Sequence, residues 1–493
     1  MAKTLLHRSL ATALAAALGC AASATWAGER GRDGPIDMSA MVERLPYVHE
    51  RLSRSALPSR GSKHAAATHF VDTCADDGSP NSLRSLIELS LDVHSGDTID
   101  LTQLPMMCSK ITLSDTFPDP AITVGLDTLY LQGPGANQLT IDANGNSSVL
   151  RHYGSGKLQV EGLTITNGHH DTSGPPEVLP RGGCIFSTGS VVLASSVVSH
   201  CEVVSSGYGY AGGGGAVYTQ GETRLYFSSI VSNTARSTID WAYGGGVVAK
   251  SGLVASYTTI SDNLATAPAY SWAGGAYVAG SVSMVGSTVF RNKSHEAAGL
   301  YIQGNGAKAT ITNSTISGNV ASGSIGGVYA FVPIKMSNST VAFNQCQACN
   351  YGAGLQLRTP NAVLTIHSSI VADNRSGRSN GGDAWGIDGA QIDPASANNL
   401  IGSSLDLAVP VGTLSDCPRL NPLADNGGTT STHSLNHSSP AIDKGDNDAS
   451  LDVDQRQLAR EIGARADIGA VEHSPTDEDE RVFLGGFDAK CEW

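Results

Sequence analysis

The sequence predicts an all-β protein built as a parallel β-helix of about eight to ten coils. Two repeated phrases carry the prediction. In the first, a small residue and a glycine precede an apolar, a variable and usually another apolar residue. This phrase occurs at Gly182–Phe186, Gly214–Tyr218, Gly245–Ala249, Gly274–Val278, Ala298–Ile302, Gly326–Ala330 and Ala353–Leu357.

The second phrase is two hydroxyl residues, an isoleucine or valine, two variable residues and an asparagine. Its copies end at Asn233, Asn263, Asn292, Asn319 and Asn344, and Asn374 closes a sixth copy with one extra residue. A period of roughly 25 to 30 residues is typical of a solenoid, whose units bury their apolar faces only against their neighbours. The repeats carry no helical periodicity, which excludes α-solenoids, and they are too short for propeller blades.

Alternation within each strand predicts which side chains face the core. We expect the first and third residues after each small-Gly pair to point inward and the intervening residue to point outward. The predicted outward column is Ile185, Val217, Val248, Tyr277, Tyr301, Tyr329 and Gln356. The recurrent asparagine suits a left-handed turn position, and stacked asparagines can hydrogen-bond from coil to coil.

The flanking segments divide the chain further. Residues 1–27 resemble a secretory signal peptide, with Lys3 and Arg8 before an apolar core and Ala22–Ala24 as a cleavage site. We expect a mobile polar leader over 28–69, a cap and first coils over 70–142, and repeats over 143–393. A small C-terminal domain over 394–472 and an acidic link and tail over 473–493 complete the division. Asn81 followed by Leu83, Leu86 and Ile87 predicts a short capping helix.

Eight cysteines follow the predicted signal peptide, and an even number in an exported chain favours disulfides. Neighbouring positions suggest three pairs: Cys74–Cys108, Cys346–Cys349 and Cys417–Cys491. The spacing of Cys346 and Cys349 also suits a redox or zinc motif, but no second ligand pair stands at a suitable distance. The formal net charge of −14 argues against nucleic acid or an anionic membrane as the partner. No later segment has the length of a membrane helix.

The repeats are similar to those of right-handed parallel β-helix surface proteins, including polymorphic outer-membrane proteins. Cys74–Ile87 with Gly96–Leu101 resembles the CSLREA-type N-terminal segment of exported bacterial β-helix proteins. Asn398–Gly402, Pro422–Gly428, Ser439–Asp443, Asp454–Arg456 and Asp467–Glu472 look like the choice-of-anchor Q domain. These resemblances imply a secreted or outer-surface protein, of families with no single known activity.

No catalytic constellation is recognisable in the repeats, although polysaccharide lyases and glycoside hydrolases use β-helix folds. Gly168–Asp171 contains His169, His170 and Asp171, which could bind a metal or act as acid and base, or lie in a solvated loop. His200 occupies a repeat-asparagine position. In the C-terminal domain, a charged set is expected to form a salt-bridge network around arginine: Asp443, Asp454, Arg456, Asp467 and Glu472.

Two binding hypotheses remain. Tyr277, Tyr301 and Tyr329 share the predicted outward column and could stack sugar rings, or pack on one another beneath loops. Asp446, Asp448 and Asp452 crowd one loop, where calcium could bind through oxygen ligands without EF-hand spacing; no other cofactor is expected. We therefore predict an adhesin-like or polysaccharide-binding protein whose partner is a polysaccharide or a host or cell-surface component. The alternatives are a polysaccharide-degrading enzyme with an unrecognised site and a structural surface stalk.

Overall fold

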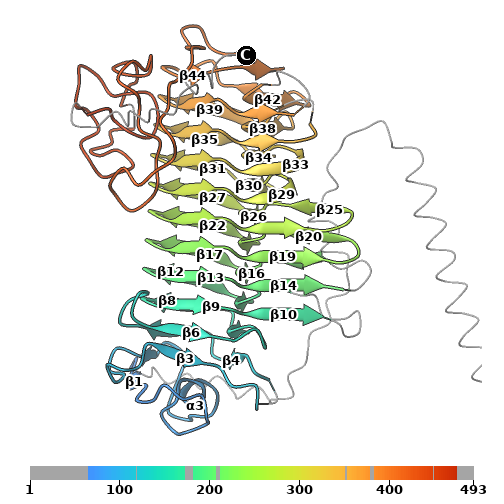
Figure 1. Ribbon diagram of the computed structural model, residues 1–493, viewed down its shortest axis with the longest axis vertical. Coiled ribbons are helices and arrows are strands. Elements are labelled where there is room, and N and C mark those ends of the chain that lie inside the picture. Colours follow the sequence, from blue (N-terminus) through green and yellow to red (C-terminus); the bar gives the residue numbers. More distant parts are fainter. Residues whose placement is uncertain are drawn as a thin grey trace, which may run out of the picture. The chain divides into compact units, whose positions relative to one another are not determined.

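The computed structural model confirms the fold class: the chain forms a parallel β-helix of about 10 coils (Figure 1). The structure describes residues 65–474, except 118, 173–180, 207–210, 350–351, 378–381 and 448. The chain divides into two compact units, 1–57 and 58–493, and every described residue belongs to the second. The predicted signal peptide and most of the leader and tail lie outside the described residues. No helix among the described residues has the length and hydropathy needed to span a bilayer.

From β8 (Lys157–Glu161) to β42 (Ala384–Ile387) the coils visit four sheets in the order A, B, D, C, whereas the described strands of the coils at either end belong to A, B and C only. Equivalent strands of successive coils pair in parallel. Sheet A contains β1 (Thr68–Phe70), β2 (Thr98–Asp100), β5 (Leu129–Gln132), β8 (Lys157–Glu161), β12 (Ser190–Ala194), β17 (Glu222–Tyr226), β22 (Gly252–Ser256), β27 (Ser281–Val285), β31 (Ala309–Thr312), β35 (Ile334–Ser337), β39 (Val363–His367) and β43 (Gln391–Ile392). Sheet B contains β3 (Lys110–Thr112), β6 (Thr140–Asp142), β9 (Thr164–Thr166), β13 (Val197–Ser199), β18 (Ser229–Val231), β23 (Thr259–Ser261), β28 (Thr288–Phe290), β32 (Thr315–Ser317), β36 (Thr340–Ala342), β40 (Ile370–Ala372) and β44 (Leu400–Ile401).

Sheet C follows the small-Gly pairs and contains β4 (Ile122–Val124), β7 (Leu150–His152), β11 (Ile185–Ser187), β16 (Val217–Thr219), β21 (Val247–Ala249), β26 (Ala276–Ala279), β30 (Leu300–Gln303), β34 (Val328–Ala330), β38 (Leu355–Arg358), β42 (Ala384–Ile387) and β45 (Ser404–Leu405). Sheet D contains β10 (His169–Thr172), β14 (Glu202–Ser205), β19 (Thr234–Ser237), β24 (Leu264–Thr266), β29 (Lys293–Glu296), β33 (Val320–Ser324), β37 (Gln345–Cys346) and β41 (Arg375–Ser376). Its remaining strands, β15 (Ala211–Gly213), β20 (Trp241–Tyr243) and β25 (Tyr270–Trp272), belong to longer excursions between sheets D and C.

The predicted columns of sheet C hold from β21 onward and are wrong for the first two copies. Val217 pairs with Val247 rather than with Val248, and Ile185 pairs with Val217. Ile185 and Val217 therefore belong to the core, and Phe186 and Tyr218 to the outward column. The cause is the Gly244–Gly246 run, which allows two alignments, and a one-residue slip exchanges the two faces of a strand.

The sixth asparagine phrase needs a similar correction. Val371, rather than Ile370, pairs with Val341, so the copy carries no extra residue. The two hydroxyl residues of the phrase have separate places. The first points inward, where the backbone N–H of one coil donates to the hydroxyl of the next, as from Thr258 to Ser287 and from Ser287 to Ser314. The second points outward from sheet B.

The asparagines form a buried ladder, as expected, but the residue before each of them takes the left-handed turn. Ser232, Asp262 and Arg291 have φ of 58°, 57° and 52°. In every step the side-chain oxygen of one asparagine accepts from the backbone and side-chain N–H groups of the asparagine in the preceding coil. The ladder runs through Asn233, Asn263, Asn292, Asn319, Asn344 and Asn374. Asp383 ends it by accepting both hydrogen bonds of Asn374.

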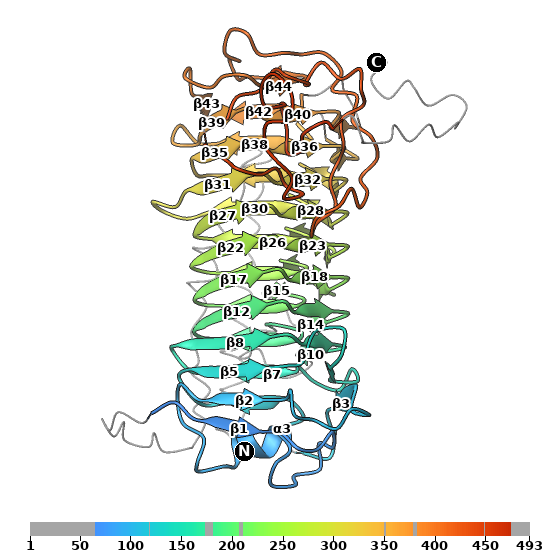
Figure 2. The same ribbon diagram turned by 90° about the vertical axis from the view of Figure 1, so that its left-hand side faces the viewer.

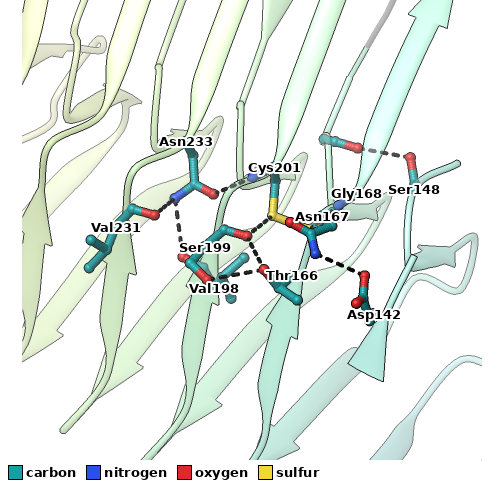
Figure 3. The surroundings of a disulfide bond; sticks show 12 residues. Asp142, Ser148, Thr166, Asn167, Gly168, Val198, Ser199, Cys201, Val231 and Asn233 are labelled. Carbon is teal, nitrogen blue, oxygen red and sulfur yellow. Dashed lines mark hydrogen bonds between the residues drawn. A yellow bond between two sulfur atoms is a disulfide. The ribbon is translucent and has the colours of Figure 1, made fainter. Parts of the chain in front are cut away.

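A disulfide closes the other end of the ladder. Cys201 donates its backbone N–H to Asn233 Oδ1 at 3.0 Å, and its sulfur is bonded to Cys184 (Figure 3). The structure also contains the expected bridges Cys74–Cys108 and Cys346–Cys349. Cys417 is disulfide-bonded, and its expected partner Cys491 lies outside the described residues.

The N-terminal cap contains the expected helix, α3 (Leu83–Glu88), but Ser82 rather than Asn81 caps it. The Ser82 side chain accepts the backbone N–H of Ser85, which satisfies one of the unpaired donors of the first turn. Arg84 is buried in the cap and pairs with Asp76 at 2.8 Å. It also donates to the carbonyls of Pro120 and Ala121. The guanidinium group of Arg84 thus has hydrogen-bond partners although it is buried, and it covers the apolar core at the N-terminal end of the solenoid.

Residues 406–474, called here the C-terminal segment, return along the outer face of sheet B over β28, β32, β36 and β40 (Figures 1 and 2). Leu435, Ala441 and Ile468 share a core cluster with Ile370 and Leu400 of the solenoid. The contacts with the outward hydroxyls are polar. Gln455 accepts from Thr315 at 2.6 Å and donates to Thr288 at 2.8 Å. The segment is therefore a docked cover that shares its apolar core with the coils.

Candidate functional site

The predicted tyrosine row exists, but its rings are buried. Tyr277, Tyr301 and Tyr329 pair in register across β26, β30 and β34. Their ring centroids are separated by 5.2 and 5.4 Å. Their exposed fractions are 1%, 1% and 3%. The rings thus pack on one another and offer no open face to a sugar.

The cover over this row comes from Tyr243 in the excursion before β21 and from two residues of the sheet C repeats, Phe331 and Arg358. Tyr243 of β20 packs its ring edge-on against Tyr277 at 5.2 Å, and Phe331 packs against Tyr329 at 4.9 Å. Arg358 Nη1 donates to the Tyr329 hydroxyl at 3.1 Å. Burial raises the pKa of that hydroxyl above its ordinary value. The row therefore stabilises sheet C by packing between coils.

Two of the three aspartates of the proposed calcium loop, Asp446 and Asp452, lie among the described residues. Asp446 pairs with Arg465 at 3.3 Å and accepts the backbone N–H of Asn447. Asp452 is exposed, and Asp448 lies outside the described residues. No group of three or more His, Cys, Asp or Glu side chains in the described part of the chain could hold a metal ion. Calcium binding here stays a prediction.

The charged set of the C-terminal segment is a buried network, which includes an arginine that the sequence analysis did not single out. Asp454 pairs with Arg456 at 3.0 Å, and Glu472 pairs with Arg460 at 2.9 Å. Asp467 accepts the backbone N–H groups of Asp443 and His473. Burial raises the pKa of Glu472 to about 7 despite the neighbouring Arg460. These groups face the interior of the segment, so they hold it together and are closed to a ligand.

The histidines of Gly168–Asp171 lie beside an open hollow of about 350 Å³ at the turn between sheets B and D. Asn144, Gly145, Asn167, Gly168, His169, His200 and Glu202 line it. His169 lies 3.4 Å from Glu202, whose other oxygen pairs with Arg236 at 3.1 Å. His170 points inward to the backbone of Arg181, and burial lowers its pKa to about 4.

The lining of this hollow contains two histidines, His169 and His200, and one carboxylate, Glu202, which is paired with Arg236. A glycoside hydrolase of the common type places two carboxyl groups on either side of the scissile bond. Glu202 is the only carboxylate among the lining residues described, and Arg236 pairs with it. The hollow can therefore hold polar groups of a ligand, but it does not display the acid and base pair of a glycosidase.

Next to the hollow, the outer face of sheet B changes from open to covered along the solenoid. Thr288, Thr315 and Thr340 are buried under the C-terminal segment. The corresponding residues of β6, β9, β13, β18 and β23 are half-buried, and we call them the open face: Thr140, Thr164, Val197, Ser229 and Thr259. The same column of small, mostly hydroxyl side chains is thus occupied at one end by protein and accessible at the other.

Two aromatic residues, the exposed Phe227 and the half-buried Tyr257, border the open face at the turns between sheets A and B. Phe227 and Tyr257 stack with centroids 5.1 Å apart and planes inclined by 11°, and Phe227 is 53% exposed. Both have positive φ, 49° and 51°. The same turn position in other coils holds Ser195, Gly286 and Asn313, which suit that conformation better than an aromatic side chain does.

The aromatic pair is the site feature that sequence reasoning missed. An exposed, conformationally strained ring contributes little to stability, and strain of this kind concentrates at functional sites. The available signal was an aromatic residue directly after a strand of sheet A, where neighbouring coils place serine, glycine or asparagine. We call Phe227 and Tyr257 the aromatic pair.

Comparisons with known proteins add one likeness in fold. No protein-family model and no curated protein matches the chain. Among solved structures, the crystal structure of pectate lyase Pel9A aligns with a TM-score of 0.41 and 15% sequence identity. The alignment covers 83% of this chain and 97% of that one.

Proposed function

We propose that the chain is an exported protein that binds a polysaccharide along the open face without cleaving it. The aromatic pair is the observation that carries this proposal. Two stacked rings, of which Phe227 is exposed and Tyr257 is half-buried, stand in strained turns of successive coils beside a row of mostly hydroxyl side chains. Together they offer the two contacts that sugars make. The face of an aromatic ring packs against the C–H groups of a sugar ring, and protein hydroxyl groups form hydrogen bonds with the hydroxyl groups at the edge of the sugar.

The geometry of the open face suits an extended ligand. Equivalent residues recur about every 4.8 Å along the solenoid, so a chain laid along sheet B would meet the same kind of group at each coil. The C-terminal segment shows that the outward hydroxyls accept and donate such bonds, since Thr288 and Thr315 bind the Gln455 amide.

The charge of the protein favours an uncharged ligand. The formal net charge is −14, and a polyanion would approach against that field. The signal-peptide pattern and the resemblance to exported β-helix proteins support secretion or display on the outer surface, where polysaccharides are met.

The proposal is tested with residues 28–493 and a panel of soluble neutral and acidic polysaccharides, reading both gel retardation and chain length. We expect retardation by a neutral polymer with no change in its length, and loss of retardation in Phe227→Ala/Tyr257→Ala. Phe70→Ala removes another exposed ring, 50% accessible, at the far end of sheet A and serves as the control. Shortened chains would replace the proposal with an enzyme, and unchanged binding by the double variant would remove the aromatic pair from it.

A further inference from the structure

Five turns between sheets A and B stack directly above one another. Gly162, Ser195, Phe227, Tyr257 and Gly286 all have positive φ, between 46° and 62°. The backbone N–H of each of the first four donates to a carbonyl of the following coil, as from Ser195 to Tyr226 and from Phe227 to Ser256. Their side chains consequently leave one edge of the solenoid in a single row. The two largest side chains stand in the middle of that row, and the smallest stand on either side.

The aromatic pair leans toward one end of the row. A β-carbon added at Gly286 would lie 2.6 Å from Cδ1 and Cε1 of Tyr257, so that ring occupies the space over the glycine. Phe227 stacks on the opposite face of Tyr257. The remaining face of Phe227 therefore looks toward the turns of Ser195 and Gly162.

Those two turns leave a gap beside the Phe227 ring. Successive coils are about 4.8 Å apart, so two turns without a large side chain open roughly 10 Å along the solenoid. Ala194 precedes Ser195 and pairs in register with Tyr226, and it adds only a methyl group. No large side chain of these two turns therefore stands against the outer face of the Phe227 ring.

A carboxylate stands on the far rim of the gap. Glu161 precedes Gly162 and pairs in register with Ala194. Its side chain is exposed. We call Glu161, Ala194, Ser195 and Phe227 the notch.

We infer that the notch is a sugar subsite that takes one uncharged or cationic pyranose unit and rejects a uronate. The inference rests on the proposed function. The pyranose stacks its C–H face on the free face of Phe227, and its hydroxyl or ammonium groups donate to Glu161. A carboxylate only accepts hydrogen bonds, so it binds donors and repels the carboxylate of a uronic acid.

The experiment measures affinity for three probes: a neutral soluble β-glucan, chitosan oligosaccharides and polygalacturonate. Wild-type protein is compared with Glu161→Ala, Glu161→Gln and Ala194→Phe, and melting temperatures verify that each variant folds. A hydrogen bond to a charged group corresponds to a change in affinity of about tenfold to a hundredfold. We expect Glu161→Ala to weaken binding of the best non-anionic probe by at least tenfold. Ala194→Phe should block the notch, and wild-type protein should bind polygalacturonate weakly or not at all.

The controls separate this inference from the function on which it rests. Glu461→Ala removes an exposed carboxylate of the C-terminal segment and should leave affinity unchanged. Suppose that the wild type binds a neutral probe through Phe227 while the Glu161 and Ala194 variants bind equally well. The proposed function then survives and the notch is overturned. Preference for polygalacturonate also overturns it, and failure of the wild type to bind any probe overturns both.

Discussion

The asparagine ladder makes the most quantitative prediction, for the variant Asn292→Ala at its centre. The Asn292 side chain accepts from the backbone N–H and the side-chain amide of Asn263, at 3.0 and 2.9 Å. It donates to Ile260 O and Asn319 Oδ1, both at 2.9 Å. Four buried hydrogen bonds at about 1 kcal/mol each predict a loss of about 4 kcal/mol. The methyl group of alanine leaves the Asn263 N–H buried without its partner.

The loss should be local, because each coil contacts only its neighbours. Urea unfolding followed by circular dichroism measures the free energy, and hydrogen exchange measures the protection of the Asn263 amide. Asn361→Ala, at an exposed loop position, is the matched control. Asn292→Asp should be as damaging as Asn292→Ala, since a carboxylate cannot donate to Asn319. Asp383→Asn should be milder, because the asparagine oxygen can still accept both hydrogen bonds of Asn374. It loses the hydrogen bond from the Ser403 hydroxyl to the second carboxylate oxygen, at about 1 kcal/mol. A loss below about 1 kcal/mol for Asn292→Ala, or unaltered exchange at Asn263, would refute the role of the ladder.

Three further variants test other parts of the structure. Cys184→Ala/Cys201→Ala opens a loop with a sequence separation of 17 residues and should lower the free energy of unfolding by about 3 kcal/mol; equal melting temperatures with and without the bridge would contradict this. Tyr301→Ala removes a buried aromatic side chain and should lower the free energy of unfolding by about 3–5 kcal/mol. Phe227→Ala should lower it by under about 1 kcal/mol and abolish ligand binding. If urea unfolding showed Phe227→Ala to be the more destabilising variant, the assignment of buried and exposed rings would be wrong. Burial raises the pKa of Glu472 from its ordinary 4.5 to about 7, so the folded state keeps a proton that the unfolded state releases in this range. The stability of the wild type should therefore fall as pH rises from about 4.5 to 7 relative to Glu472→Gln, and urea midpoints that show parallel profiles would exclude that contribution.

Periodicity in the sequence was sufficient to predict the coils, because each repeat places its apolar residues by simple alternation. The alignment failed where the spacing was ambiguous, at the first two copies of sheet C and at the adjacent Ile370 and Val371. Gly244, Gly245 and Gly246 allow two registers, and the pairing of Val217 with Val247 depends on how the preceding excursion through β20 enters the sheet. Glycine has no side chain, so a run of glycines gives no apolar or polar pattern that shows which residues face the core.

The site could be predicted much less well than the coils. The alignment of Tyr277, Tyr301 and Tyr329 follows from the repeat, but their burial depends on Tyr243, which comes from a variable stretch between repeats. Phe227 and Tyr257 are recognisable as unusual only when the turn conformation is known, because the positive φ at these positions cannot be read from the amino-acid sequence. The cover over β28 to β40 depends on residues more than a hundred positions away, such as Gln455 on Thr315, and no local pattern encodes that contact.

The central claim is that a polysaccharide binds at the open face beside the aromatic pair. Hydrogen–deuterium exchange with and without the best-bound polysaccharide locates the contact directly. The account predicts added protection over residues 194–199, 226–231 and 256–261, and none over 276–279 or 300–303 of sheet C. Protection confined to sheet C or to the hollow around His169, or no change in exchange anywhere along the chain, would contradict it.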